Sequence, residues 1–132
     1  MNGTAGITVH IVSFDVPYPP DYGGVIDVYY KIRSLHSAGA GVILHCYTHK
    51  RPPARDLEDI CREVHYYPRR TGLAVNLGLM PYIVAGRMAD DLSARLSGDR
   101  HPVIFEGLHT CGILDHPALA GRKLVYRESN IE

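Results

Sequence analysis

The residues best suited to chemistry lie in the stretch from His10 to Gly24, where a proline-rich loop ends in a pair of glycines. The loop is stiffened by three prolines, Pro17, Pro19 and Pro20. Each proline fixes its own φ and favours an extended backbone at the residue before it. Gly23 and Gly24 let backbone N–H groups approach a ligand closely. Because the first N–H groups of a helix carry positive partial charge and lack intrahelical partners, a helix beginning here suits an anion such as a phosphate.

The cysteines and histidines favour neither a disulfide framework nor a metal site. Cys46, Cys61 and Cys111 are odd in number, far apart in the chain, and form no C-x-x-C pair. We therefore expect reduced thiols in a cytosolic protein, some of them buried. The eight histidines include no H-E-x-x-H motif, and we expect no metal.

Length and charge narrow the class of protein further. A chain of 132 residues is enough for one domain with a core of its own. Its formal net charge of +0 gives no support to a nucleic-acid partner. No segment approaches the roughly 20 apolar residues of a membrane span, and the N-terminus has no signal-peptide pattern. We expect a cytoplasmic protein.

A helix from Val25 to Ala38 is predicted to follow the glycine pair. One face collects Val25, Val28, Tyr29, Ile32, Leu35 and His36. Asp27 and Lys31 have the favourable spacing for a surface ion pair, and Gly39 is a natural stop. The glycines do not follow the G-x-G-x-x-G spacing, so NAD binding is not favoured.

Apolar runs of strand length alternate with helical segments along the chain. The predicted strands lie around residues 7–12, 42–46, 64–67, 102–107 and 123–127. Shorter helices are expected at 57–62, capped by Asp56, and at 88–96, with a short helix or irregular segment at 69–78, a helix starting at Pro81 and a helical piece within 108–119. This alternation predicts a Rossmann-like three-layer α/β/α domain with a mostly parallel sheet. Residues 14–24, 107–111 and 127–132 follow strand ends, where such sheets bind ligands.

The order of these motifs resembles the N-terminal domain of a GT-B-fold glycosyltransferase, in the family-four-like group of retaining enzymes and of bacterial type. Members of this group typically open with an apolar strand, a proline-containing loop that ends in Gly-Gly, and a helix. The segment from Val103 to His109 is similar to the fourth strand of the group, which often leads into a histidine. The closing Arg127–Glu132 resembles a segment that usually reads Arg-x-His-Asn-Ile-Glu, but Ser129 replaces the histidine here.

The resemblance covers nearly all of the chain and implies a longer enzyme with two Rossmann-like domains. Residues 1–132 would form the acceptor-side domain, truncated, while a donor domain absent from this sequence would hold the nucleotide-sugar. The implied activity is transfer of a sugar, of the hexosyltransferase type, from a nucleotide-sugar to a glycan or lipid-linked acceptor. The chain alone would be inactive. No cofactor beyond the nucleotide-sugar co-substrate is implied, and peripheral membrane contact would suit a lipid-linked acceptor.

The resemblance also suggests roles for individual residues. Gly23 and Gly24 would bind the donor diphosphate, and His109 would act as the catalytic histidine over the transferred sugar. Acceptor hydroxyls would be bound by Asp15, Tyr18, Asp21, Tyr22 and Glu106. Glu132 is a further candidate for an interdomain or acceptor contact. His36, His45, His65 and Cys111 are interpreted as packing residues.

Several alternative readings remain open at this point. The glycine pair could serve only to start the helix, and His109 could be structural. The polar residues of the first loop could simply be solvated. The whole chain could be a standalone flavodoxin-like module that binds a sugar or phosphate without catalysis. A receiver domain is disfavoured, because Asp15 is a single carboxylate after the first strand and Arg127 stands near the place of the expected lysine.

Overall fold

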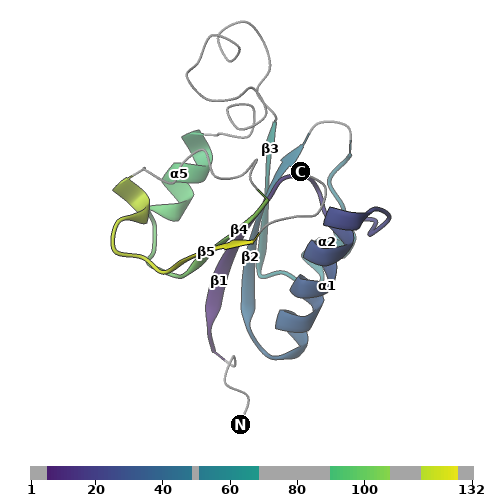
Figure 1. Ribbon diagram of the computed structural model, residues 1–132, viewed down its shortest axis with the longest axis horizontal. Coiled ribbons are helices and arrows are strands. Elements are labelled where there is room, and N and C mark those ends of the chain that lie inside the picture. The colour runs from purple at the N-terminus through teal and green to yellow at the C-terminus, as the bar shows by residue number, and fades with distance from the viewer. Residues whose placement is uncertain (1–5, 49–50, 69–89, 108–116, 128–132) are drawn as a thin grey trace, which may run out of the picture.

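The computed structural model describes residues 6–48, 51–68, 90–107 and 117–127 of the chain (Figure 1). The predicted segments at 69–78, at the helix starting at Pro81 and over most of 108–119 lie outside these residues, as do His109, Cys111 and Glu132.

Five parallel strands form the sheet at the centre of the fold. They are β1 (Thr8–Ser13), β2 (Gly41–Thr48), β3 (Glu63–Pro68), β4 (Val103–Glu106) and β5 (Leu124–Arg127). Their order across the sheet is β3-β2-β1-β4-β5. This confirms the predicted α/β fold with a parallel, Rossmann-like sheet. The strand order reverses at β1, so the carboxyl end of β1 faces the crevice where open α/β sheets bind ligands.

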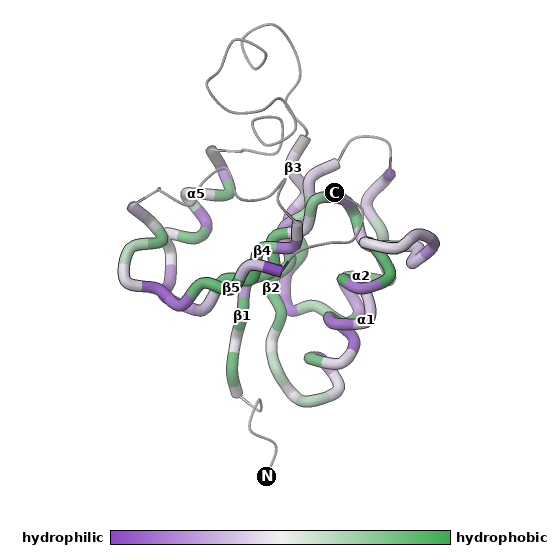
Figure 2. Tube along the Cα trace, viewed as in Figure 1, coloured by the Kyte–Doolittle hydropathy of each residue, from purple (hydrophilic) through white to green (hydrophobic). Residues whose placement is uncertain are grey.

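Helices cover both faces of the sheet. Helices α1 (Gly23–Ser37) and α2 (Arg55–Glu58) lie on one side, and α5 (Asp90–Leu96) with the 3-10 turn η2 (Pro117–Leu119) lies on the other (Figure 1). The first layer buries a core of Val9, Ile11, Val28, Ile32, Val42, Leu44 and Leu57. The second buries Val12, Tyr47, Tyr67, Leu92, Leu96, Val103 and Phe105. Figure 2 shows the strands at the centre of the sheet as mostly hydrophobic, as expected for a sheet covered on both faces.

The α1 helix differs from its predicted form in three ways. It begins at Gly23 rather than Val25, with Tyr22 as an extended N-cap. His36 is exposed and does not belong to the buried face, which is formed by Val25, Val28 and Ile32. Lys31 binds Glu106 of β4 and not Asp27. A lysine in reach of a buried carboxylate gains more from that partner than from an exposed one on the helix surface.

The ends of the other helices also differ in detail. The α2 helix begins at Arg55 after Ala54, so Asp56 lies in its first turn and is not its cap. There its charge favours the helix through the dipole. The stop at Gly39 is confirmed, because this glycine has a φ of 89° and donates to His36 O at 3.0 Å.

The β5 strand forms one edge of the sheet. Its side chains are exposed, with Leu124, Val125 and Tyr126 at 37%, 40% and 46% exposure. In the part of the chain that the structure describes, no helix has both the length and the apolar character needed to cross a membrane.

Candidate functional site

The loop after β1 is held by the carboxylate of Asp15. The Oδ1 atom of Asp15 accepts from Val16 N at 2.8 Å, and its Oδ2 accepts from the hydroxyl of Tyr22 at 3.0 Å. The Ser13 hydroxyl, at the end of β1, donates to the backbone oxygen of Asp15 at 2.5 Å. These bonds tie the start of the loop to the residue that precedes α1. They place a carboxylate and a phenol, both suited to binding sugar hydroxyls, beside the carboxyl end of β1.

The start of α1 is the feature most suited to an anion. Tyr22 makes no side-chain cap, and the first turn of the helix contains no acidic residue. The first helical hydrogen bond runs from Ile26 N to Tyr22 O at 2.9 Å, so the N–H groups of Gly23 and Gly24 precede the helical ladder. Gly23 is exposed while Gly24 is buried, and neither has a positive φ. The N–H groups and the dipole of α1 therefore favour negative charge at Gly23.

Arg51 clamps the second half of this loop. Its Nη1 donates to the Asp21 carboxylate at 2.8 Å, its Nη2 donates to Pro19 O, and its guanidinium lies 5.5 Å from the centre of the Tyr22 ring. The side chain is 16% exposed, whereas that of Asp21 is 56% exposed. Arg51 thus fixes the backbone just before Gly23, and its charge lies beside the helix start.

A second charged group lies at the ends of β4 and β5. Glu106 is buried, with 3% exposure, and binds Lys31 of α1 through Oε2. Arg127 of β5 lies 3.7 Å from the other Glu106 oxygen and 3.7 Å from the carboxylate of Asp27. Gly107 N also donates to Arg127 O at 2.8 Å. Two of the three loops that were predicted to converge begin at residues 107 and 127. These first residues do lie together; the rest of both loops is outside the described residues.

The predicted site residues are only partly brought together. Asp15, Asp21, Tyr22, Gly23 and Gly24 lie in one hydrogen-bonded loop, while Glu106 has its own cations and is poorly exposed to a ligand. Tyr18 turns toward the α1 and α2 layer: its ring is 5.6 Å from that of Tyr29, and a hydrogen bond with Asp56 raises the pKa of the Tyr18 hydroxyl. His109 lies outside the described residues.

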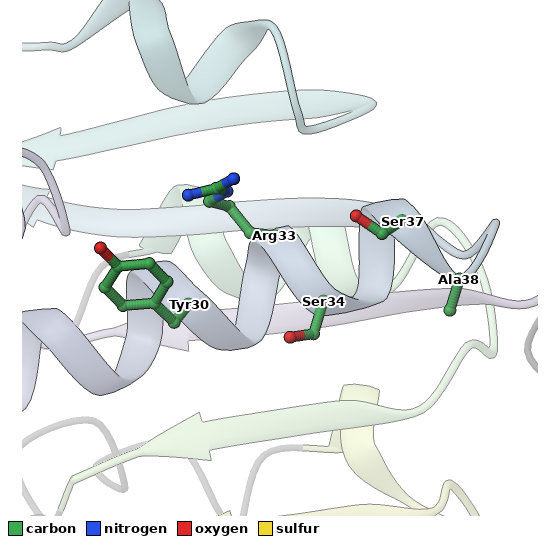
Figure 3. A pocket seen from close by; sticks show the side chains of 5 residues that line it. All are labelled: Tyr30, Arg33, Ser34, Ser37 and Ala38. Atoms are coloured by element: carbon green, nitrogen blue, oxygen red, sulfur yellow. The ribbon is translucent and has the colours of Figure 1, made fainter.

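A shallow hollow of about 640 Å³ lies away from this edge, along the outer side of α1 (Figure 3). Tyr30, Arg33 and Ser34 line it toward the helix middle, and Ser37 and Ala38 line it toward the helix end. The Arg33 guanidinium lies 5.7 Å from the centre of the Tyr30 ring. This contact is ordinary for an exposed helix surface.

Sequence reasoning missed several polar groups. Arg51 gave no usable signal, and the spacing of Lys31 pointed to Asp27, because the actual partners of both residues lie far away in the chain. His10 and His45 did give one, since each is a polar residue inside an apolar strand. His45 is predicted to be a packing residue. It is fully buried, and it also forms hydrogen bonds with His10 and Tyr67. A buried imidazole requires polar partners, and this requirement was the available clue.

Comparison with known proteins identifies no relative: no family model matches the sequence, and no curated protein or solved structure matches the chain.

Proposed function

We propose that this chain is the acceptor-side, N-terminal domain of a GT-B-fold glycosyltransferase, and that the donor diphosphate binds at the start of α1. The observation that carries the proposal is the position of that helix start. It follows the carboxyl end of β1, where the strand order reverses, and its first turn has no acidic side chain. The order of the sequence motifs supports the same assignment.

The proposed chemistry breaks the bond between the anomeric carbon of the sugar and the diphosphate oxygen. The hydroxyl oxygen of the acceptor forms the new bond to that carbon, and its proton passes to the departing diphosphate oxygen. Negative charge grows on the leaving diphosphate as the bond breaks. Backbone N–H groups at Gly23 and Gly24 are already fixed in position by the helix, so they stabilise this charge without rearrangement. A second Rossmann-like domain would hold the nucleotide and close the site.

The acceptor would lie against the first loop. Asp15 and Tyr22 offer a carboxylate and a phenol that already contact each other, and both groups can exchange that contact for hydroxyls of a glycan or lipid-linked acceptor. His109, by the resemblance of its segment, would contact the transferred sugar. Glu106 would not contact the acceptor itself. It would hold Lys31 and Arg127 at the carboxyl ends of the strands.

The first experiment tests the full-length gene product against a panel of nucleotide-sugars, with release of nucleoside diphosphate as the readout. The proposal expects release with one donor or a small group of related donors. If a folded protein releases no nucleoside diphosphate from any donor in the panel, with candidate acceptors present, the proposal is contradicted. Binding of sugar or phosphate without release would favour the standalone binding module.

The second experiment tests the helix start through Gly23→Glu. A carboxylate in the first turn favours the helix by about 0.3–1 kcal/mol, so folding should be unchanged or slightly improved. The same charge repels a diphosphate, so donor use should fall at least tenfold. Ser34→Glu adds an equal charge to an exposed position of the same helix and should leave donor use unchanged. Equal activity of the two variants would contradict the proposal that the diphosphate binds at the start of α1.

A further inference from the structure

A chain of buried hydrogen bonds runs through the α5 side of the sheet, away from the start of α1. His10 of β1 is 2% exposed and His45 of β2 is fully buried. The Nδ1 atom of His10 lies 2.8 Å from Nε2 of His45. The Nε2 atom of His10 lies 2.9 and 3.0 Å from the carboxylate oxygens of Asp99, and Nδ1 of His45 lies 2.7 Å from the Tyr67 hydroxyl. Arg95 of α5 reaches the same hydroxyl at 3.4 Å. We call these five residues the histidine chain.

The charge at one end of the histidine chain fixes the direction of every bond in it. The Asp99 carboxylate can only accept, so His10 must donate from Nε2. A neutral His10 then has a bare Nδ1, which must accept from Nε2 of His45. A neutral His45 in turn has a bare Nδ1 and accepts from the Tyr67 hydroxyl. Arg95 can only donate, which agrees with this direction at the far end.

Several charged and titratable groups lie near the two imidazoles. Arg122, which precedes β5, donates to Asp99 at 2.9 Å, and the His101 ring lies 6.2 Å from that of His10. On the β3 side, the His65 ring lies 5.4 Å from that of His45, and His65 also contacts Glu63 at 2.9 Å. A cavity of about 150 Å³ adjoins the chain and is lined by His10, His45, His65, Arg95 and Asp99, among others. Solvent protons therefore have a route to the imidazoles.

We propose that the histidine chain is a proton-driven switch, in which one added proton reverses the bonds between His10 and Tyr67 and a second proton separates His10 from His45. In the reversed state His10 carries protons on both nitrogens and forms an ion pair with Asp99. The Nε2–H bond of His45 is replaced by an Nδ1–H bond, so His45 changes tautomer but stays neutral. The Tyr67 oxygen then accepts from His45, and its own hydroxyl proton turns away.

A second proton cannot be accommodated in the same arrangement. It would place an N–H of one imidazolium against an N–H of the other across 2.8 Å, inside a buried layer. The two rings must then move apart, which admits water from the cavity. Leu92 and Leu96 attach α5 to this layer, and Asp99 lies three residues beyond the end of α5 at Leu96. The α5 side of the sheet is therefore the part that acid should loosen.

The protonation states of the individual groups agree with the direction derived for neutral pH. Burial lowers the pKa of His10, against the raising effect of Asp99, and burial with the nearby His10 and His65 holds the pKa of His45 well below 6.5. Burial raises the pKa of Tyr67 to about 12, so this group remains a phenol and a donor. For Asp99, burial acts to raise the pKa, but the bonds from His10 and His101 outweigh it and lower the pKa.

The test uses ¹⁵N NMR of the imidazole nitrogens during a pH titration of the protein. At pH 8 both His10 and His45 should be protonated at Nε2 and bare at Nδ1. On acidification His10 should become doubly protonated while His45 moves its single proton to Nδ1, both with one shared midpoint. Two rings that titrate independently, or a His45 that keeps its proton on Nε2 while His10 gains charge, would overturn the proposal.

A substitution at the anchor supplies the second measurement. Asp99→Asn keeps an oxygen that accepts from His10 but removes the charge that stabilises the imidazolium, so the reversal should shift to lower pH by at least half a unit. Asp59→Asn removes an exposed carboxylate beside α2 and should leave the midpoint unchanged. An unchanged midpoint in Asp99→Asn would also overturn the proposal. If this variant fails to fold, the tautomers of the unsubstituted protein still decide the question. The switch does not depend on the proposed glycosyl transfer.

Discussion

Acid should destabilise this domain in the pH range where free histidines titrate. His10 and His45 are buried and neutral, and burial lowers the pKa of both. In the unfolded chain each imidazole returns to an ordinary pKa of about 6.5. The unfolded state therefore binds more protons than the folded state as pH falls below 6.5, and the free energy of unfolding falls with it. The stabilisation is present above pH 6.5 and is lost as pH falls toward the lowered pKa values.

The size of this effect follows from counting protons. Each proton bound only in the unfolded state changes the free energy of unfolding by about 1.4 kcal/mol per pH unit once binding is complete. Integrated from pH 6.5 to 5.5, a buried histidine that stays neutral in the folded state contributes about 1 kcal/mol, so the two together contribute at most about 2 kcal/mol. Asp99 adds its own loss only at lower pH, because the ordinary pKa of its carboxyl is 3.8 and its folded value is lower still. The two contributions thus occupy separate pH ranges.

The assay is urea unfolding at a series of pH values and constant ionic strength. The unsubstituted protein should lose up to about 2 kcal/mol between pH 6.5 and 5.5, and His45→Gln should lose about 1 kcal/mol less over that interval. His36→Gln removes an exposed imidazole on the opposite side of the sheet and should keep the full dependence. A free energy of unfolding that is flat over this interval, or one that falls equally in His45→Gln, would refute the reasoning.

Three further predictions concern packing, the buried carboxylate and the thiols. Leu96→Ala removes a fully buried side chain and should lower the free energy of unfolding in urea by about 2–5 kcal/mol. The control Leu124→Ala, on the exposed β5, should lower it by less than about 1 kcal/mol. Similar losses in the two variants would contradict the assigned core. Glu106→Gln should cost about 1–3 kcal/mol because Lys31 loses a charged partner, and its control Glu58→Gln, an exposed position on α2, should be near neutral by the same assay. Burial raises the pKa of Cys61 to about 12 and holds the pKa of Cys46 well above its usual value. Alkylation of both thiols at pH 8, followed by peptide mass spectrometry, should therefore be far slower in the folded than in the unfolded chain. Fast labelling of Cys46 before unfolding would count against its burial.

The sequence was enough to predict the sheet, because the strands satisfy a simple requirement. The central strands β1 and β2 lie between helices or loops and carry apolar runs long enough to be covered on both faces. Parallel strands joined by helices then leave few topologies open. The stop at Gly39 was equally accessible, because a positive φ at the end of a helix favours glycine.

The partners of charged residues were not accessible from the sequence. Asp27 and Lys31 have the spacing of a helical ion pair, but the buried Glu106, far along the chain, competes for the same lysine. Local patterns describe neighbours within a helix and carry no information on which distant carboxylate will be buried beside it. The direction of bonds in the histidine chain is another such case, since it follows from Asp99, a residue outside both histidine strands.

The central position of β1 has a consequence for how the chain folds as it is synthesised. His10 pairs with Ile43 on one side and with Val103 on the other. The ribosome adds about 5–20 residues per second, so roughly 3–11 seconds separate the synthesis of the end of β2 from that of the start of β4. During this interval the edge of β1 that will pair with β4 is unpaired in the growing chain, although every residue of β1 is buried in the final fold. Slowing translation after residue 48 should therefore lengthen the exposure of β1 to chaperones and to other nascent chains.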